Sequence, residues 1–238
     1  MRFLVFQHAP TEHPGSFRDF MIADGIGWDT VSFDDGGTIP ASGHHDALLV
    51  LGGPMDVWEE DIHPWLRAEK AFIADWVRAG RPYLGICLGH QLLADALGGT
   101  VGKMDHPEVG VCEVRLTHEG VASPLFSGCA PALPTLQWHG AAVTALPAGA
   151  KVLAANDHCA IQALQVGPRA FGIQYHVEII DRTVRDWGAI PEYRCALESI
   201  TGAGGQERLE EATAARMVEF HAAARTLYGN FRDLVPKR

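Results

Sequence analysis

The chain has 238 residues, and 19 Lys and Arg residues against 29 Asp and Glu residues give it a formal net charge of −10. Hydrophobic residues make up 47% of the chain and charged residues 20%, which is ordinary globular usage and excludes a disordered chain, a collagen-like repeat and a coiled coil. The sequence contains no cluster of Lys and Arg residues. Nucleic acid is therefore not expected as a partner, because its affinity for proteins depends largely on Lys and Arg.

Membrane and secretory signals are not found in the sequence. No apolar run approaches the ~20 residues that span a bilayer, and the N-terminus lacks both the long apolar core and the cleavage site of a signal peptide. Five cysteines contain no Cys-x-x-Cys pair, and the histidines show no metal-ligand spacing. We therefore expect a cytoplasmic protein with no membrane partner, no metal and no cofactor.

Short apolar runs alternate with helical stretches up to residue 99. The predicted strands are residues 2–8, 30–33, 47–51 and 81–87. The predicted helices are residues 17–24, 65–79 and 88–97. This alternation predicts an α/β fold with a doubly wound, mostly parallel sheet flanked by helices, in the manner of flavodoxin.

The pattern changes after residue 99. Residues 109–116 and 136–145 are predicted strands of a smaller antiparallel region, and residues 161–166 and 170–177 are two further strands joined by Gly167-Pro168. Residues 191–200 and 207–227 are predicted helices with an apolar stripe. Because no interdomain linker is visible, we expect one domain over residues 1–238, with a helical extension from about residue 190.

Cys87 is the first candidate for chemistry. The segment Gly85-Ile86-Cys87-Leu88-Gly89 has the form of a nucleophile elbow, in which a sharp strand-to-helix turn exposes the nucleophile and the glycines avoid clashes. The turn also places the cysteine at a helix N-terminus, where backbone N–H groups favour a thiolate. A buried cysteine that merely packs is the alternative for this segment alone.

Two further segments could complete such a site. In the predicted strand ending near Glu178, His176 and Glu178 lie two residues apart and so share a face, as a base and its orienting carboxylate require. Gly52 and Gly53 follow an apolar strand and could bring a backbone N–H close to a substrate, where it would pair with the N–H of Leu88 in an oxyanion hole. Each segment alone is also consistent with an ordinary strand end.

Taken together, the segments resemble the class I, triad-type glutamine amidotransferases, and most closely the free-standing proteins similar to the amidotransferase domain of GMP synthetase. The residues that carry the resemblance are Gly52-Gly53-Pro54-Met55, Gly85 to Gln91 with Gly98-Gly99, Gln137-Trp138-His139-Gly140 and Gly172 to Glu178. They cover roughly residues 45–180 in the order of the family.

The resemblance implies a specific activity and a set of residue roles. Cys87, His176 and Glu178 would form a triad that releases ammonia from glutamine through a γ-glutamyl thioester. The resemblance assigns the oxyanion hole to the backbone at Gly53 and Leu88. It implies a substrate pocket made by Gly52, Gln91, Trp138, His139 and Gly140, with His139 structural rather than catalytic.

Departures from the family pattern leave alternatives open. Ala141 stands where relatives often have an acidic residue, Val177 replaces a common proline, and no nucleotide-binding loop of a synthetase is present. The ammonia acceptor would then be a separate synthetase subunit or water. One alternative is a γ-glutamyl peptidase or hydrolase that acts on γ-glutamyl conjugates, and the other is a catalytically silent regulatory or binding subunit.

Overall fold

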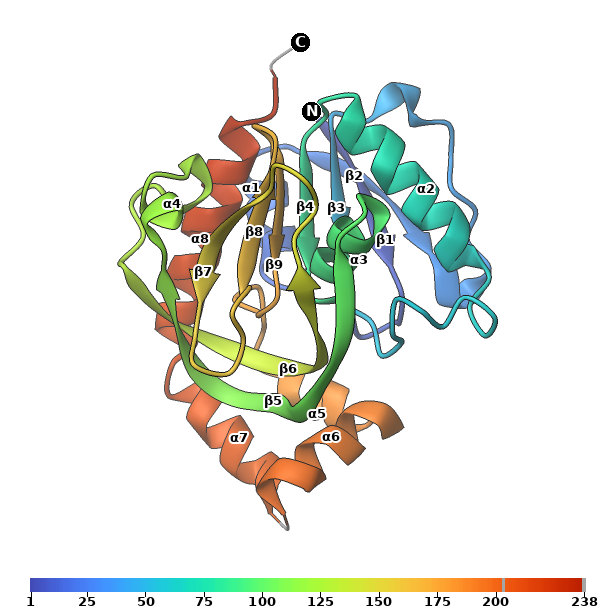
Figure 1. Ribbon diagram of the computed structural model, residues 1–238. Coiled ribbons are helices and arrows are strands. Elements are labelled where there is room, and N and C mark those ends of the chain that lie inside the picture. Colours follow the sequence, from blue (N-terminus) through green and yellow to red (C-terminus); the bar gives the residue numbers. More distant parts are fainter. Residues whose placement is uncertain (203, 237–238) are drawn as a thin grey trace.

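The computed structural model describes residues 1–202 and 204–236. Within these residues, nine strands form one mixed sheet in the order β2-β1-β3-β4-β9-β8-β7-β5-β6 (Figure 1). The strands are β1 (Arg2–Gln7), β2 (Gly27–Ser32), β3 (Ala47–Val50), β4 (Tyr83–Ile86), β5 (Thr100–Leu116), β6 (Ala132–Ala145), β7 (Lys151–Ala155), β8 (Ala163–Val166) and β9 (Ala170–Ile173). The first five strands in this order pair in parallel and the remaining pairs are antiparallel, which confirms the predicted α/β fold.

Both faces of the parallel half are covered, as its nearly continuous apolar strands predict. Successive side chains of β1 enter opposite cores: Phe3 and Val5 pack in one cluster, and Leu4 and Phe6 pack in the other. Strand β3 divides its residues in the same way. The period of two residues along each strand therefore supplies both hydrophobic layers.

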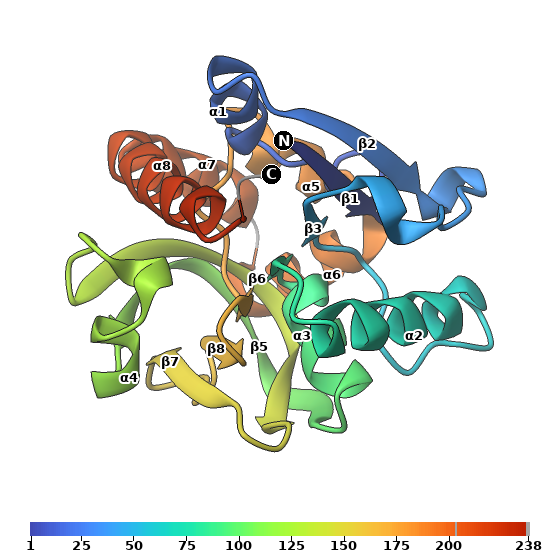
Figure 2. The same ribbon diagram turned by 90° about the horizontal axis from the view of Figure 1, so that it is seen from above.

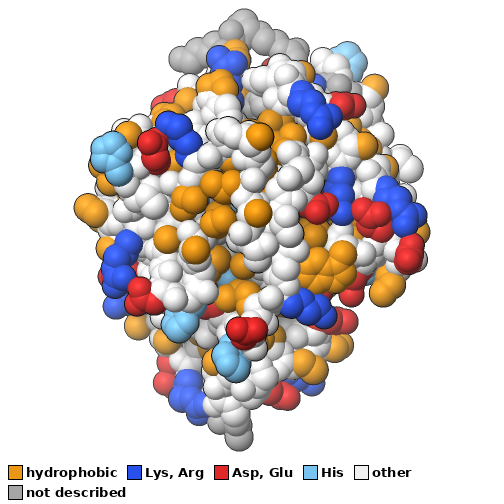
Figure 3. Space-filling view, in the orientation of Figure 1, with side chains coloured by type: hydrophobic (Ala, Val, Ile, Leu, Met, Phe, Trp, Pro, Cys, Tyr) orange, Lys and Arg blue, Asp and Glu red, His pale blue; other side chains and the backbone are white. Residues whose placement is uncertain are grey.

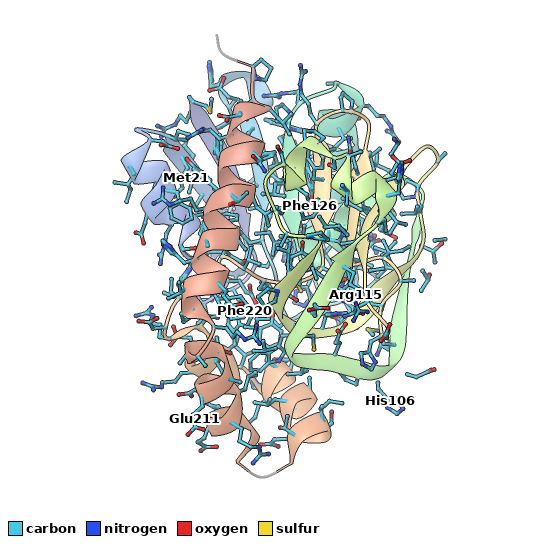
Figure 4. The ribbon with its side chains drawn as sticks, turned by 90° about the vertical axis from the view of Figure 1, so that its left-hand side faces the viewer. Met21, His106, Arg115, Phe126, Glu211 and Phe220 are labelled. Atoms are coloured by element: carbon cyan, nitrogen blue, oxygen red, sulfur yellow. The ribbon has the colours of Figure 1, made fainter. Side chains whose placement is uncertain are left out.

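Helices from distant parts of the chain cover the two faces (Figure 2). Helices α2 (Trp65–Arg78) and α3 (Leu88–Ala96) pack on one face, and α1 (Phe17–Ala23) and α8 (Met217–Asp233) pack on the other. Figure 4 shows α8 running along the molecule between Met21 of α1 and Phe126 of the short 3-10 helix η3 (Pro124–Phe126). The C-terminal helix thus completes a layer that the N-terminal helix begins.

The antiparallel half is built on a long pairing of β5 with β6. Strand β5 begins at Thr100, well before the predicted start at residue 109, and β7 was not predicted at all. Register shifts interrupt the pairing between Lys103 and Glu108, so the hydrophobic alternation that would mark the first part of β5 is broken. A short helix, α4 (His118–Val121), follows β5.

The helical extension contains α5 (Thr183–Gly188), α6 (Pro191–Thr201), α7 (Gly205–Ala214) and α8. The prediction of one helix over residues 207–227 is wrong, because the chain ends α7 and begins α8 at Met217. The reason is tertiary: α7 packs on α5 and β5, whereas α8 turns away to contact α1, η3 and β6. Figure 1 shows α5, α6 and α7 together at the end of the molecule beneath β5 and β6.

Charged side chains of both signs are interspersed on the face seen in Figure 3. The ion pairs of the molecule include Arg67 with Glu60 and Lys151 with Glu119. No helix among residues 1–202 and 204–236 is long and apolar enough to cross a membrane.

Candidate functional site

Cys87 joins β4 to α3 in a strained turn. Its backbone has φ 52° and ψ −105°, and it is the one non-glycine residue with positive φ in the part of the chain that the structure describes. Two hydrogen bonds hold this conformation: the Cys87 N–H donates to the Ile173 carbonyl at 2.8 Å, and the Cys87 carbonyl accepts from the Gln91 N–H at 3.1 Å. Backbone strain of this kind persists only where surrounding contacts impose it.

The two glycines of the turn are required by close backbone approach. A Cβ atom at Gly85 would overlap the carbonyl of Gly89, and a Cβ at Gly89 would overlap the carbonyl of Val50 on β3. Glycine removes both clashes. The Gly-x-Cys-x-Gly pattern thus corresponds to a tight strand-to-helix turn that lifts the cysteine to the carboxyl edge of the sheet.

His176 lies beyond the end of β9, not within a strand as the sequence suggested. Strand β9 ends at Ile173, after which His176 forms an isolated antiparallel bridge with Leu136 of β6. The backbone N–H of each of these two residues donates to the carbonyl of the other, at 2.9 and 3.0 Å. Strand β9 pairs with β4, whereas His176 pairs with β6. The chain therefore leaves the parallel half of the sheet between Ile173 and His176.

The side chains of Cys87, His176 and Glu178 nevertheless converge. Nδ1 of His176 donates to Oε1 of Glu178 at 2.7 Å, and Oε2 of Glu178 accepts from the Val177 N–H at 3.0 Å. Cys87 lies close enough to the His176 ring to favour its protonated form. All three residues are at least 95% buried.

The electrostatics of His176 favour the protonated ring. Burial by itself lowers the pKa of His176, but the charge and hydrogen bond of Glu178 and the proximity of Cys87 outweigh burial and raise the pKa well above its ordinary value. A ring in this setting can take a proton from the Cys87 thiol and keep it. The arrangement is therefore suited to a thiolate beside an imidazolium.

A cavity of about 160 Å³ opens beside Cys87. Its lining includes most of the residues that the sequence assigned to the oxyanion hole and substrate pocket: Gly53, Leu88, Gln91, Trp138, His139 and Gly140. Gly52 does not line it; its carbonyl accepts a hydrogen bond from Nδ1 of His8 at 2.8 Å, and a Cβ on it would meet the Glu12 carboxylate at 2.5 Å. The structure thus brings the predicted pocket residues together around the cavity, with the exception of Gly52.

Both nitrogens of the buried His139 ring have partners within the protein. Its Nδ1 donates to the carbonyl of Ala141 at 2.9 Å, and its Nε2 lies 3.2 Å from Oε2 of Glu108. Burial opposes ionisation of Glu108, but the hydrogen bond and charge of His139 outweigh burial and lower the pKa of Glu108. These bonds indicate that the His139 ring supports the cavity wall.

The helical extension supplies site residues that the sequence did not reveal. The ring of Trp187 on α5 lies edge-on to the His176 ring with centroids 4.5 Å apart. Tyr193 on α6 lines the cavity, and its hydroxyl donates to Oε1 of Glu12 at 2.6 Å. Burial chiefly raises the pKa of Glu12, while His176 and Tyr193 oppose the rise. No local signal could have found a pair that is 181 positions apart.

Among residues 1–202 and 204–236, no group of three or more His, Cys, Asp or Glu residues is placed to hold a metal ion.

Comparison with known proteins agrees with this geometry. A family model described as "Glutamine amidotransferase class-I" matches residues 27–186. The chain belongs to this family. The family match contains Cys87, His176 and Glu178, together with most of the parallel strands that position them.

Relatives within the class I glutamine amidotransferase family include GMP synthases. The chain is 37% identical over 132 residues to the glutamine-hydrolyzing GMP synthase of Aeropyrum pernix, a match that covers 56% of the chain and 24% of that protein. It is 34% identical over 137 residues to a protein of Sulfurisphaera tokodaii that is named as one of the subunits of a glutamine-hydrolyzing GMP synthase, with 57% of the chain and 68% of that protein covered. The match thus spans about a quarter of the Aeropyrum pernix synthase.

Solved structures extend the likeness to the whole chain. The crystal structure of a glutamine amidotransferase from Thermotoga maritima superposes with a TM-score of 0.87 at 26% sequence identity. The superposition covers 100% of this chain and 99% of the other. The helical extension, which lies mostly beyond the family match, therefore has a counterpart in that amidotransferase.

Proposed function

We propose that the protein hydrolyses the side-chain amide of glutamine, with Cys87 as nucleophile, His176 as base and acid, and Glu178 as the carboxylate that orients His176. The observation that carries the proposal is the position of the His176 ring, whose Nδ1 bonds to Glu178 at 2.7 Å and whose protonated form is favoured by the neighbouring Cys87. A base held between a nucleophile and a carboxylate is the arrangement that covalent amide hydrolysis requires.

The first half of the reaction transfers the γ-glutamyl group to sulfur. The Cys87 thiol gives its proton to His176, and the thiolate attacks the side-chain amide carbon. Negative charge on the carbonyl oxygen is received by the backbone N–H groups of Gly53 and Leu88, both of which belong to residues that line the cavity. The carbon–nitrogen bond breaks, and the nitrogen takes the proton from His176. Ammonia departs, and the γ-glutamyl group remains bound to the Cys87 sulfur as a thioester.

Water completes the cycle. His176 removes a proton from a water molecule, and the resulting hydroxide attacks the thioester carbon. The carbon–sulfur bond breaks, glutamate leaves, and the proton returns to sulfur. Throughout both halves, Glu178 stabilises the charged ring of His176 and keeps Nδ1 as a donor.

The acceptor of the ammonia is proposed to be a separate synthetase subunit, or water when no such partner is present. The Sulfurisphaera tokodaii relative is named as one subunit of a GMP synthase, which supports a two-chain arrangement. The acceptor is tested by adding a synthetase chain from the same organism with its nucleotide substrate and measuring whether amide nitrogen from glutamine enters the product.

The hydrolytic step is tested by incubating the purified protein with glutamine and measuring ammonia and glutamate. We expect the unchanged protein to release ammonia and glutamate in equal amounts. We expect the same of Cys195→Ser, because Cys195 is exposed on α6 and does not line the cavity. We expect at least a hundred-fold loss for Cys87→Ser. Full turnover by Cys87→Ser would overturn the assignment, and no turnover by the unchanged protein with any donor or partner would favour a silent binding subunit.

The wall at Ala141 favours a second candidate. Ala141 lines the cavity directly after Gly140, and its side chain offers no carboxylate to the ammonium group of free glutamine. γ-Glutamyl conjugates share the reacting carbon with glutamine and would form the same thioester. A panel of γ-glutamyl compounds compared by kcat/KM separates the two: a higher value for a conjugate than for glutamine identifies a γ-glutamyl hydrolase.

A further inference from the structure

A second side chain reaches the Cys87 sulfur besides His176. Gln174 directly follows β9 and is completely buried. Its Nε2 lies 3.7 Å from Sγ of Cys87, within the range of an N–H donor to sulfur. Its backbone N–H donates to the Gln162 carbonyl at 2.8 Å, so the residue is anchored to the neighbouring chain segment.

The hydrogen-bond network determines which end of the Gln174 amide faces the sulfur. The carbonyl of Ala141 can only accept, and Gln91 meets it with Nε2 at 3.1 Å. The same Nε2 donates to Oε1 of Gln174, also at 3.1 Å. Because the oxygen of the Gln174 amide is occupied by this donor, its NH₂ group is the end that remains for Cys87. The orientation therefore follows from a backbone acceptor rather than from a choice between two similar atoms.

The network is buried along its whole length. Gln174, Gln91 and Cys87 are each at least 95% buried, so water does not compete for these bonds. The Ala141 carbonyl at its far end also accepts from His139, whose ring is held by Glu108. A connected set of hydrogen bonds thus runs from the supported wall of the cavity to the nucleophile, with Gln91 donating in both directions.

We propose that Gln174 is a further catalytic residue, whose amide N–H stabilises the Cys87 thiolate, and that Gln91 is the positioning residue that keeps the amide in this orientation. The proposal rests on the proposed function in that it takes Cys87 to be the nucleophile. No atom is transferred by Gln174. An N–H bond to an ionised acceptor is stronger than to a neutral one, so the donor favours the thiolate over the thiol before attack and again when the thioester is cleaved.

The test measures the ionisation of Cys87 directly and needs no turnover. The rate of Cys87 alkylation by iodoacetamide is followed across pH by mass spectrometry of the Cys87 peptide, so the other cysteines do not interfere. Gln174→Met keeps the length of the side chain and removes the N–H. We expect the pH midpoint of alkylation to rise by about one unit, which is about a ten-fold loss of thiolate below the midpoint, as for the loss of one hydrogen bond to a charged group.

Two further variants make the outcome decisive. Gln91→Met leaves the Gln174 oxygen without its donor and should raise the midpoint by a smaller amount, because the amide can then turn. Gln165→Met removes an amide on β8 that bonds to Ser123 and Gly167 instead, and should leave the midpoint unchanged. If Gln174→Met does not fold, Gln91→Met carries the test.

An unchanged midpoint in every folded variant of Gln174 and Gln91 would overturn the proposal, as would an equal shift in Gln165→Met. A glutamine assay separates this failure from that of the proposed function. If the unchanged protein releases no ammonia, the proposed function fails while the alkylation test still reports on Gln174. If it does release ammonia, Gln174→Met should lower kcat with little change in KM, since the amide contacts the sulfur and not the cavity.

Discussion

His90 makes the stability of this fold sensitive to acid. It lies on α3, three residues after Cys87, and is completely buried. A Cβ on Gly172 of β9 would come within 2.7 Å of its Nδ1, so the ring has no room to move toward the sheet. Burial lowers the pKa of His90 to about 3, and the folded protein therefore holds this ring neutral.

The size of the effect follows from the two pKa values. An unfolded histidine titrates near its ordinary value of about 6.5, and each unit of difference is worth about 1.4 kcal/mol. Because the folded pKa is the lower one, the contribution of His90 to stability is present above pH 6.5 and is lost as the pH falls. The loss is about 2 kcal/mol between pH 7 and pH 5, and about 4 kcal/mol between pH 7 and pH 3.

Urea unfolding at pH 7 and pH 5 measures this loss. His90→Gln removes the titrating group, so the free energy of unfolding of this variant should fall by about 2 kcal/mol less than that of the unchanged protein over the same interval. His118→Gln replaces an exposed histidine of α4 and should follow the unchanged protein. An equal acid loss in His90→Gln and the unchanged protein would refute the reasoning.

Three substitutions, with Gly229→Ala as a control, test the site and the turn beneath it. Glu178→Gln removes the charge that holds the His176 ring protonated, so we expect kcat for glutamine to fall by about 10²–10⁴-fold; an unaltered kcat would contradict the pairing. Gly89→Ala should lower the free energy of unfolding by about 1–3 kcal/mol through overpacking, whereas Gly229→Ala, in open space on α8, should raise it by about 0.5–1 kcal/mol; calorimetry that ranks them the other way would refute the clash. Tyr193→Phe takes the donor from a buried carboxylate and should cost about 1–3 kcal/mol in urea unfolding, and no loss would mean that water replaces the hydroxyl.

The parallel half of the fold was predictable because its information is local. Alternating residues of β1 and β3 fill two hydrophobic layers, so the strands read as continuous apolar runs. The turn at Cys87 was equally predictable from the sequence. A side chain at Gly85 or Gly89 would clash with backbone atoms, so only glycine fits at these two positions. Sequence patterns of this kind follow from covalent geometry and short-range packing.

The break between α7 and α8 could not be predicted for the opposite reason. The chain from Ala214 to Arg216 contains neither glycine nor proline and consists of good helix formers. The helix ends there because α7 is drawn onto α5 and β5 while α8 follows the sheet toward α1. Tertiary packing overrides local propensity at this point, as it also does where His176 leaves β9 to bridge β6.

The residues that sequence reasoning missed share one property: each acts through a contact between remote segments. Glu12 is a single carboxylate in a loop after β1, and only the fold brings it to the Tyr193 hydroxyl. Trp187 is an ordinary amphipathic position of α5 until its ring is placed against His176. Polar or aromatic residues of this kind carry no spacing that would mark them as parts of a site.

This difference explains why the family match ends where it does. The match stops at residue 186, yet the superposition on the Thermotoga maritima amidotransferase continues over the helical extension. A turn that tolerates only glycine at two positions is tightly constrained in sequence, whereas a wall of packed side chains can exchange residues of similar volume and keep its shape. The extension places Trp187 against His176 and Tyr193 in the cavity lining, and it is therefore the part of the proposed site where residues can change without loss of the Cys87 turn.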